Sequence, residues 1–272
     1  MLGSGSFLTS DARARMTMQQ VPRPSAAPLR PPPDLREDCG ALLVRRLAGP
    51  AAHIDVLHGL NGRHRALVAG EVLFHMGEGQ SALYVSRRGS LKSVAINEDG
   101  DEQVIGFHLP GELIGLDALG SGRHRCLAVA LEAGEVCELN LAQLEQAARE
   151  VQGLQHGLLR LMGHTVEFDQ DHLAILSRPQ AIERLAMFLV NLSFRLRAQG
   201  IESQRSNLPM SRAEIASYLG LVIETVSRGF GRLQEDGLIR IAGRKLQLLD
   251  MAGLCALAHC THLLPEVAAR RA

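Results

Sequence analysis

Polar and apolar positions alternate over short distances in the middle of the chain. Between about Leu67 and Leu141, apolar runs such as "EVLF", "ALYV", "VIGFHL" and "CLAVAL" are separated by glycine turns, among them "EDGD". Short runs that recur about every 8–12 residues, with turns between them, are typical of antiparallel strands. We therefore expect this part of the chain to fold as an antiparallel β-sandwich or barrel.

The period lengthens to three and four residues between positions 154 and 177. The side chains on one stripe of this segment are Leu154, Leu158, Leu161, Thr165, Phe168, His172 and Ile175. So long a stripe on one helix, directly after a compact β domain, indicates pairing with the same helix of a second copy, although packing on its own domain would need the same pattern.

The candidate dimer contacts of this helix are Leu158, Leu161, Thr165, Phe168, Asp169 and Ile175. Asp169 lies beside the stripe. Its carboxylate is either a solvated flank or a charge that tunes the strength of the dimer.

The last third of the chain is predicted to contain helices followed by a hairpin. Ser177 and Pro179 mark the end of the long helix and the start of the next, "QAIERLAMFLVNLSFRLRAQG", which ends at Gly200. The later elements are a helix Arg212–Leu219, a helix from Ile223 to about Gln234, two strands around Ala242–Gly243, and a closing helix in the apolar tail 251–264. This order is that of a winged helix-turn-helix.

The spacing of small and apolar residues inside the helix pair is specific. Ala216 is small where two helices must approach closely. Gly220 follows where the turn benefits from positive φ, and Val226 lies where the second helix must enter the core. This spacing favours a helix-turn-helix whose second helix enters the major groove of DNA.

The second helix carries a polar face suited to reading bases. Glu224, Ser227 and Arg228 share this face on a 3.6-residue period. Arginine binds the O6 and N7 atoms of guanine, glutamate accepts from the N4 of cytosine, and serine serves several bases. A solvated face with an ion pair between Glu224 and Arg228 is the alternative. The candidate DNA contacts, including those to phosphate, are Glu224, Thr225, Ser227, Arg228, Arg232, Arg244 and Lys245.

Composition narrows the class of protein. The 272 residues carry a formal net charge of zero, so positive charge for a nucleic acid must be gathered locally. Five cysteines without a CxxC pair exclude a secreted disulfide framework. With no signal peptide and no apolar run of about 18 residues, we expect a cytoplasmic protein without a membrane partner.

These patterns divide the chain into four parts and give an α+β fold class. Residues 1–34 are rich in Gly, Ser, Pro and Arg and are expected to be a disordered leader. A β domain at 35–150, a dimerisation helix at 151–178 and the winged helix-turn-helix at 179–272 follow. The chain shows no nucleophile with its base, no P-loop and no metal-hydrolase signature, so an enzyme is not expected.

In this order the parts resemble the CRP/FNR superfamily of bacterial transcription regulators, and most closely its oxygen-responsive fumarate and nitrate reduction branch. The similarity covers about residues 35–262 and rests on "GDEQVIGFHLPGELIGLDALGSG", "EVCELN", "RLMGHTVEFDQDH", "ERLAMFLVNLS" and "YLGLVIETVSRGFGRLQEDGLI". It implies an N-terminal β-roll like that of cyclic-nucleotide-binding domains. It also implies a homodimer that reads a TTGAT-like inverted repeat through Glu224, Ser227 and Arg228, and that contacts RNA polymerase at promoters.

The sensor part departs from this family in its cysteines. Members with a [4Fe–4S] cluster use three closely spaced N-terminal cysteines and one from the β domain, and four thiolates are the usual ligand set. This chain matches them only at Cys39 and Cys137, with Arg36 and Arg45 at the neighbouring positions. A conventional iron–sulfur cluster is therefore not expected, and no cofactor is predicted.

Cyclic nucleotide is not expected either. Leu116 stands where nucleotide-binding relatives carry a glutamate for the ribose, which leaves Arg125 alone to match their phosphate-binding arginine.

Three explanations of the signal stay open. A thiol switch would use Cys39 and Cys137, either as separate thiols or as a disulfide, with nearby arginines lowering the thiol pKa. A regulator without ligand, constitutively dimeric and controlled through its abundance, is the second. A haem or another gas-sensing cofactor is the third, and its candidate ligands are among the eleven histidines, which include His53, His58, His64, His75 and His108. The rival to a DNA-binding regulator is a ligand-binding module whose DNA-binding domain is vestigial. The intact polar face of the second helix argues against that rival.

Overall fold

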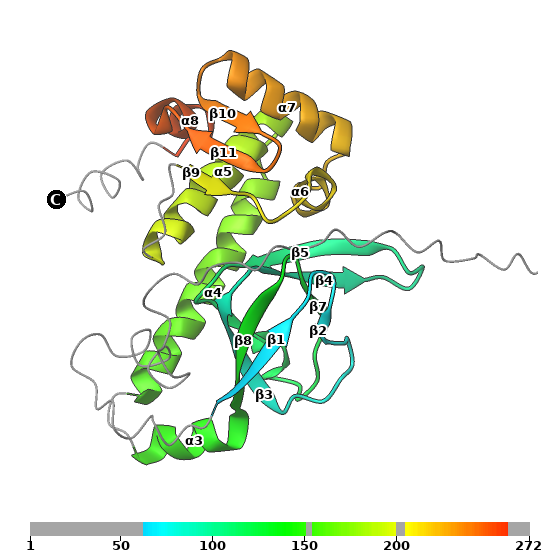
Figure 1. Ribbon diagram of the computed structural model, residues 1–272, viewed down its shortest axis with the longest axis vertical. Helices are drawn as coiled ribbons and strands as arrows, with labels where there is room; N and C mark the ends of the chain where they lie inside the picture. The colour runs from blue at the N-terminus through cyan, green and yellow to red at the C-terminus, as the bar shows by residue number, and fades with distance from the viewer. Residues whose placement is uncertain (1–61, 151–153, 200–204, 261–272) are drawn as a thin grey trace, which may run out of the picture. The chain divides into compact units, whose positions relative to one another are not determined.

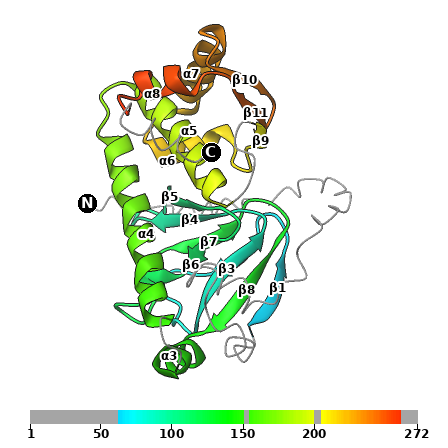
Figure 2. The same cartoon turned by 90° about the vertical axis from the view of Figure 1, so that its left-hand side faces the viewer.

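Two four-stranded antiparallel sheets form the first part of the structure (Figures 1 and 2). The computed structural model describes residues 62–150, 154–199 and 205–260. The strand orders are β1-β8-β3-β6 and β2-β7-β4-β5. The strands are β1 (Arg63–Leu67), β2 (Val72–Phe74), β3 (Ala82–Arg88), β4 (Leu91–Ile96), β5 (Glu102–His108), β6 (Leu113–Ile114), β7 (Leu127–Ala130) and β8 (Gly134–Asn140). The expected antiparallel β domain is confirmed, and its first described strand begins at Arg63, before Leu67.

The alternation of side chains along β3 explains how this β-roll is covered on both faces. Ala82 and Tyr84 belong to the cluster of buried residues between the two sheets. Leu83 and Val85 belong to a second cluster, which also contains Leu144 and therefore packs the sheet against helices. A strand buried on both sides must be apolar at consecutive positions, as "ALYV" is.

Two helices follow the β-roll. They are α3 (Leu141–Glu150) and α4 (Leu154–Leu176), the second of which confirms the long helix expected over 154–177. Leu144 of α3 and Leu154 of α4 are buried against the sheet, and Ile175 is buried near the other end of α4. Much of the remaining surface of α4 is exposed.

The C-terminal part is built around α5 (Ala181–Ala198), whose side chains are mostly buried. Around it lie α6 (Arg212–Leu219), α7 (Ile223–Glu235), α8 (Met251–Leu257) and a sheet of order β10-β11-β9 made from β9 (Arg205–Asn207), β10 (Ile239–Ala242) and β11 (Lys245–Leu248). The expected helix pair and hairpin are confirmed. The sequence pattern did not indicate β9, and α8 ends at Leu257 although a helix was expected over 251–264, of which 261–264 lie outside the described residues.

The β4–β5 hairpin packs against α6, which is the first helix of the helix-turn-helix (Figure 1). Lys92 on β4 forms an ion pair with Glu214 on α6 at 2.8 Å. The backbone N–H of Val104 on β5 donates to the hydroxyl of Ser217 at 2.9 Å. No helix among the described residues is long and apolar enough to cross a lipid bilayer.

Candidate nucleic-acid interface

Local capping interactions fix both ends of α6, the first helix of the pair. Ser211 accepts a hydrogen bond from the N–H of Glu214 at 3.2 Å, and the Glu214 carboxylate accepts from the N–H of Ser211 at 2.7 Å. This reciprocal capping box starts α6. At the other end Gly220 has φ of 62°, a left-handed conformation that costs glycine least. The turn to α7 is therefore set locally, as the sequence indicates.

The inner face of α7 fixes the helix in the core. Val226, Phe230 and Leu233 are each at most 2% exposed. Ala216 on α6 is also buried, which confirms its assignment as a close-approach position. Gly229 lies so near α5 that a Cβ built there would meet Leu185 Cδ2 at 2.9 Å. These contacts fix the orientation of α7 about its own axis. They therefore determine which residues lie on the outer face of the helix.

The polar residues predicted to read bases lie on that outer face. Glu224, Ser227 and Arg228 are exposed, and Thr225 is half-buried beside them. Arg228 Nη2 donates to Thr225 Oγ1 at 3.5 Å, and among the described residues no ion pair joins Glu224 to Arg228. Gly231, one turn further on, has no atom of the chain within 4 Å of its Cβ position. The face is thus open and unpaired, as contact with base edges requires.

Two apolar residues at the start of α7 were not identified from the sequence. Val222 and Ile223 are 63% and 42% exposed, although they are among the most hydrophobic residue types. The N-terminal turn of a recognition helix is the part that reaches base edges, and apolar side chains there contact the methyl group of thymine. The signal that identifies them is their position immediately before Glu224, within the first helical turn.

The candidate phosphate contacts surround this face. Arg244 and Lys245 are exposed at the turn of the β10–β11 hairpin, where Gly243 has φ of 59°. Arg232 is exposed on α7, with its Nε atom 3.8 Å from Asp236. Arg240 on β10 is exposed as well and was not identified from the sequence. The chain therefore gathers positive charge locally despite its zero net charge.

The segment of the β-roll compared above with nucleotide-binding relatives makes contacts within the chain. The rings of Phe74 and His124 stack with their centres 3.6 Å apart, and His124 is 4% exposed. Asp117 accepts from the backbone N–H of Arg125 at 2.7 Å. Leu116 is half-buried, and the Arg125 side chain points to solvent. This arrangement provides no pair of glutamate and arginine for a cyclic phosphate and its ribose.

The described cysteines lie in three places. Cys126 is buried in the β-roll and Cys255 and Cys260 are buried together in the C-terminal part; all three are free, and burial raises the pKa of Cys126 and Cys260 to about 12. Cys137 in β8 is fully buried and is not a free thiol. The described residues contain no group of three or more potential metal ligands, and Cys39 lies outside them. The thiol-switch hypothesis stays a prediction.

The histidines considered as haem ligands are dispersed. His53 and His58 lie outside the described residues. His64 Nδ1 lies 2.6 Å from a carboxylate oxygen of Glu135, and His108 Nε2 lies 2.7 Å from the Ser93 hydroxyl. His75 is exposed at the end of β2.

The candidate dimer residues on α4 face two directions. Leu158 and Leu161 pack against the β-roll cluster, and Ile175 is 1% exposed within the C-terminal core. Phe168 lies under the Arg195 guanidinium at 4.8 Å, and Thr165 is half-buried. Asp169 is exposed at the edge of this face, beside the space between α4 and α5. On a separate, exposed side of α4 an apolar residue recurs every seventh position: Leu159, Val166 and Leu173, which are 59%, 53% and 67% exposed.

Two family models match this chain. The Crp-like helix-turn-helix domain matches residues 183–257, and the cyclic nucleotide-binding domain matches residues 64–151. The two matches correspond to the C-terminal part around α5 and to the β-roll with α3.

Several known proteins are similar over most of the chain. The transcriptional activator protein Anr of Pseudomonas protegens is 43% identical over 223 residues, 82% of this chain and 91% of that protein. The fumarate and nitrate reduction regulatory protein of Escherichia coli is 39% identical over 205 residues, 75% of this chain and 82% of that protein. The structure of FixK2 from Bradyrhizobium japonicum matches with a TM-score of 0.66 and 30% identity over 72% of this chain and 96% of FixK2.

Proposed function

The chain belongs to the CRP/FNR family of transcription regulators, in its FNR-like branch, and from this premise we propose that it is a homodimeric, cytoplasmic activator that binds a TTGAT-like inverted repeat. The observation that carries the proposal is the outer face of α7, where Glu224, Ser227 and Arg228 are exposed and not paired with one another. RNA polymerase is the second proposed partner, because the similar proteins include activators.

The proposed reading of DNA divides the interface into two kinds of contact. The outer face of α7 lies against base edges, with Val222 and Ile223 against thymine methyl groups. The hairpin residues Arg244 and Lys245, with Arg232, contact phosphates and set the register of the protein. Sequence preference therefore resides in α7, and affinity for any DNA resides largely in the arginines and the lysine.

Equilibrium binding tests the proposal. One duplex carries the inverted repeat and a second carries the same bases scrambled, and both are titrated by fluorescence anisotropy over a range of salt. We expect the affinity for both to fall steeply with salt, because phosphate contacts release counterions, while the preference for the repeat persists. Equal affinity for the two duplexes at every salt concentration would contradict the proposal.

A substitution separates base reading from phosphate binding. Glu224→Ala should relax the preference at one base pair of each half-site by about 1–3 kcal/mol, since the variant lacks the carboxylate that accepts from cytosine. Binding to duplexes with single changes at each half-site position measures it. Glu98→Ala, at the exposed turn between β4 and β5, is the control and should keep the wild-type preference. An unchanged profile for Glu224→Ala would show that this residue reads no base.

The proposed dimer forms along the exposed stripe of α4. Leu159, Val166 and Leu173 recur every seven residues, and Asp169 lies three residues after Val166. In a parallel pair of helices such positions face their own copies across the two-fold axis. Of the dimer contacts predicted from the sequence, this proposal keeps Asp169. The apolar contacts move to residues on the exposed stripe, because the stripe predicted from the sequence packs against the protein's own β-roll.

Asp169 is expected to weaken this dimer. Burial already raises the pKa of its carboxyl within one chain, and pairing would bring two carboxylates together in an apolar seam. Asp169→Ala should therefore lower the dimer dissociation constant about tenfold. Sedimentation equilibrium measures the change, with Asp99→Ala on the β4–β5 turn as the control. A weaker dimer after Asp169→Ala would place the interface elsewhere.

A further inference from the structure

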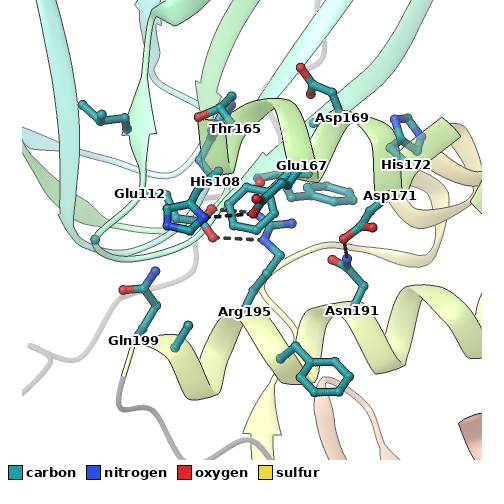
Figure 3. Close-up of a pocket in the computed structure, with 18 of the residues that line it drawn as sticks. His108, Glu112, Thr165, Glu167, Asp169, Asp171, His172, Asn191, Arg195 and Gln199 are labelled. Carbon is teal, nitrogen blue, oxygen red and sulfur yellow. Dashed lines mark hydrogen bonds and ion pairs between the residues drawn. The ribbon is translucent and has the colours of Figure 1, made fainter. Parts of the chain in front are cut away.

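A cavity of about 500 Å³ lies where the β-roll, α4 and α5 meet (Figure 3). Its walls come from β5 and the turn to β6, from one face of α4, from α5, and from Tyr218 on α6. Cavities of about 300–1,000 Å³ with largely apolar walls are typical of sites for small organic molecules. The cavity is distinct from the DNA-binding face of α7 and from the part of the β-roll beside His124.

Aromatic side chains form part of the apolar walls of the cavity. Phe107 comes from β5, Phe168 from α4, and Phe194 from α5. The Tyr218 ring lies 4.9 Å from the Phe107 ring, centre to centre, and stacks on His172 at 3.8 Å. Rings held by such contacts form a preorganised surface for an apolar or aromatic group.

The charged residues that line the cavity are unbalanced. Four carboxylates line it, whereas Arg195 is its single guanidinium. Arg195 is already engaged: its Nε donates to Glu112 Oε1 at 3.0 Å, its Nη2 donates to Glu112 Oε2 at 2.5 Å and to the Phe107 carbonyl, and both side chains are at most 8% exposed. An anionic ligand would have to displace Glu112 from a buried ion pair, which is costly.

The histidines of the cavity do not supply the missing positive charge. Burial lowers the pKa of His108 to about 4, although Glu112 opposes this shift, so its ring is neutral at neutral pH. Burial also lowers the pKa of His172, whose Nε2 lies 2.8 Å from the carbonyl of Tyr218. His164 is at the exposed edge, where it pairs with Glu167 at 2.9 Å.

Two acceptors in the cavity are incompletely matched within the described part of the chain: one carboxylate has no cation in direct contact, and one amide oxygen has no hydrogen-bond donor. Asp171 accepts from the Asn191 amide at 2.7 Å, and among the described residues no cation pairs with its carboxylate. Burial raises the pKa of Asp171, and the hydrogen bond from Asn191 and the more distant charge of Arg195 oppose this shift without cancelling it. The Oε1 atom of Gln199 is buried and has no hydrogen-bond partner. A buried acceptor without a donor is unfavourable unless a ligand or water supplies one.

We propose that this cavity binds a small organic cation, an amine with an apolar or aromatic body. Its ammonium group donates to the Asp171 carboxylate, whereas Gln199, about two turns of α5 beyond Asn191, belongs to another part of the cavity wall. The body of the ligand lies against the aromatic walls, where ring faces also favour a cation. The charge imbalance selects an amine over a carboxylate or an alcohol of the same size.

The position of the cavity gives the ligand a route to the DNA-binding part. The pair of Glu112 and Arg195 joins the turn between β5 and β6 to α5, and it forms part of the cavity wall. A ligand bound beside this ion pair would favour one position of α5 relative to the β-roll. This consequence depends on the proposed function, whereas binding of the amine does not and is measured without DNA.

Calorimetry with three probes of similar size tests the proposal on the full chain. The probes are phenethylamine, 3-phenylpropionate and 3-phenylpropanol, which carry a positive charge, a negative charge and no charge. We expect the amine to bind at least about tenfold more tightly than either other probe, because it alone pairs with the carboxylate. This comparison uses the wild-type protein and so does not depend on the folding of any variant.

A matched pair of variants locates the site. Asp171→Asn retains the shape of the side chain and should weaken amine binding about tenfold, while Asp99→Asn on the β4–β5 turn should leave it unchanged. The proposal is overturned if no probe binds, if the carboxylate or the alcohol binds as well as the amine, or if both variants behave alike. Gel shifts with and without the amine then test the link to DNA separately.

Discussion

Arg228→Ala abolishes discrimination at one base pair in each half-site and lowers specific binding by about 1–3 kcal/mol per half-site. The guanidinium is exposed on the outer face of α7, and its recorded contact in the free protein is one long hydrogen bond to Thr225. Little is therefore lost when it leaves that contact for the O6 and N7 atoms of guanine. The measurement is the affinity for a set of duplexes that differ singly at each position of the half-site.

Arg232→Ala is the matched control for this experiment. Arg232 lies on the same helix and is exposed, with Asp236 at 3.8 Å. If Arg232 contacts phosphate, its replacement should lower the affinity for all duplexes by a similar factor. It should also reduce the slope of log K against log salt concentration by about one. If Arg228→Ala also weakens every duplex uniformly, Arg228 binds phosphate and the proposed base reading is contradicted.

The second large effect concerns stability. Arg195→Met should reduce the free energy of unfolding by about 3–5 kcal/mol, because Glu112 would keep its charge in a buried position without a partner. Both side chains are nearly inaccessible, and they hold the β5–β6 turn against α5. Urea unfolding followed by circular dichroism measures the change.

A double variant distinguishes the pair from the packing around it. Replacing both partners, as in Arg195→Met with Glu112→Leu, should recover much of the lost stability, since no uncompensated charge remains. Arg232→Met removes an arginine that is largely exposed and should change stability by less than about 0.5 kcal/mol. A double variant no more stable than Arg195→Met alone would show that shape, and not charge, is what the pair contributes.

The helix-turn-helix could be predicted from the sequence because its signals are local. A capping box at Ser211, a glycine with positive φ at Gly220 and a buried Val226 lie within sixteen residues, and together they fix the ends and the rotation of both helices. The residues proposed to read DNA then follow from helical periodicity. Val222 and Ile223 were missed because apolar residues are usually assigned to a core, although their position directly before Glu224 places them at the start of α7, where the structure shows them exposed.

The proposed dimer face was harder to predict because α4 carries two apolar stripes. Leu158 and Leu161 face the β-roll, whereas their neighbours Leu159 and Val166 are exposed, and periodicity alone does not tell which stripe meets the chain's own β-roll. The cavity was beyond prediction for a different reason. Asp171, Gln199 and Tyr218 lie far apart in sequence and meet only through tertiary packing, so no short motif contains them.

The central claim is that α7 of two copies reads an inverted repeat. The most direct test is selection of bound sequences from a pool of random duplexes by the wild-type protein, with no sequence assumed beforehand. We expect the enriched sequences to contain two TTGAT-like half-sites in inverted orientation, with centres about one helical turn apart. Enrichment of no motif, or of a single half-site without its inverted copy, would contradict the claim.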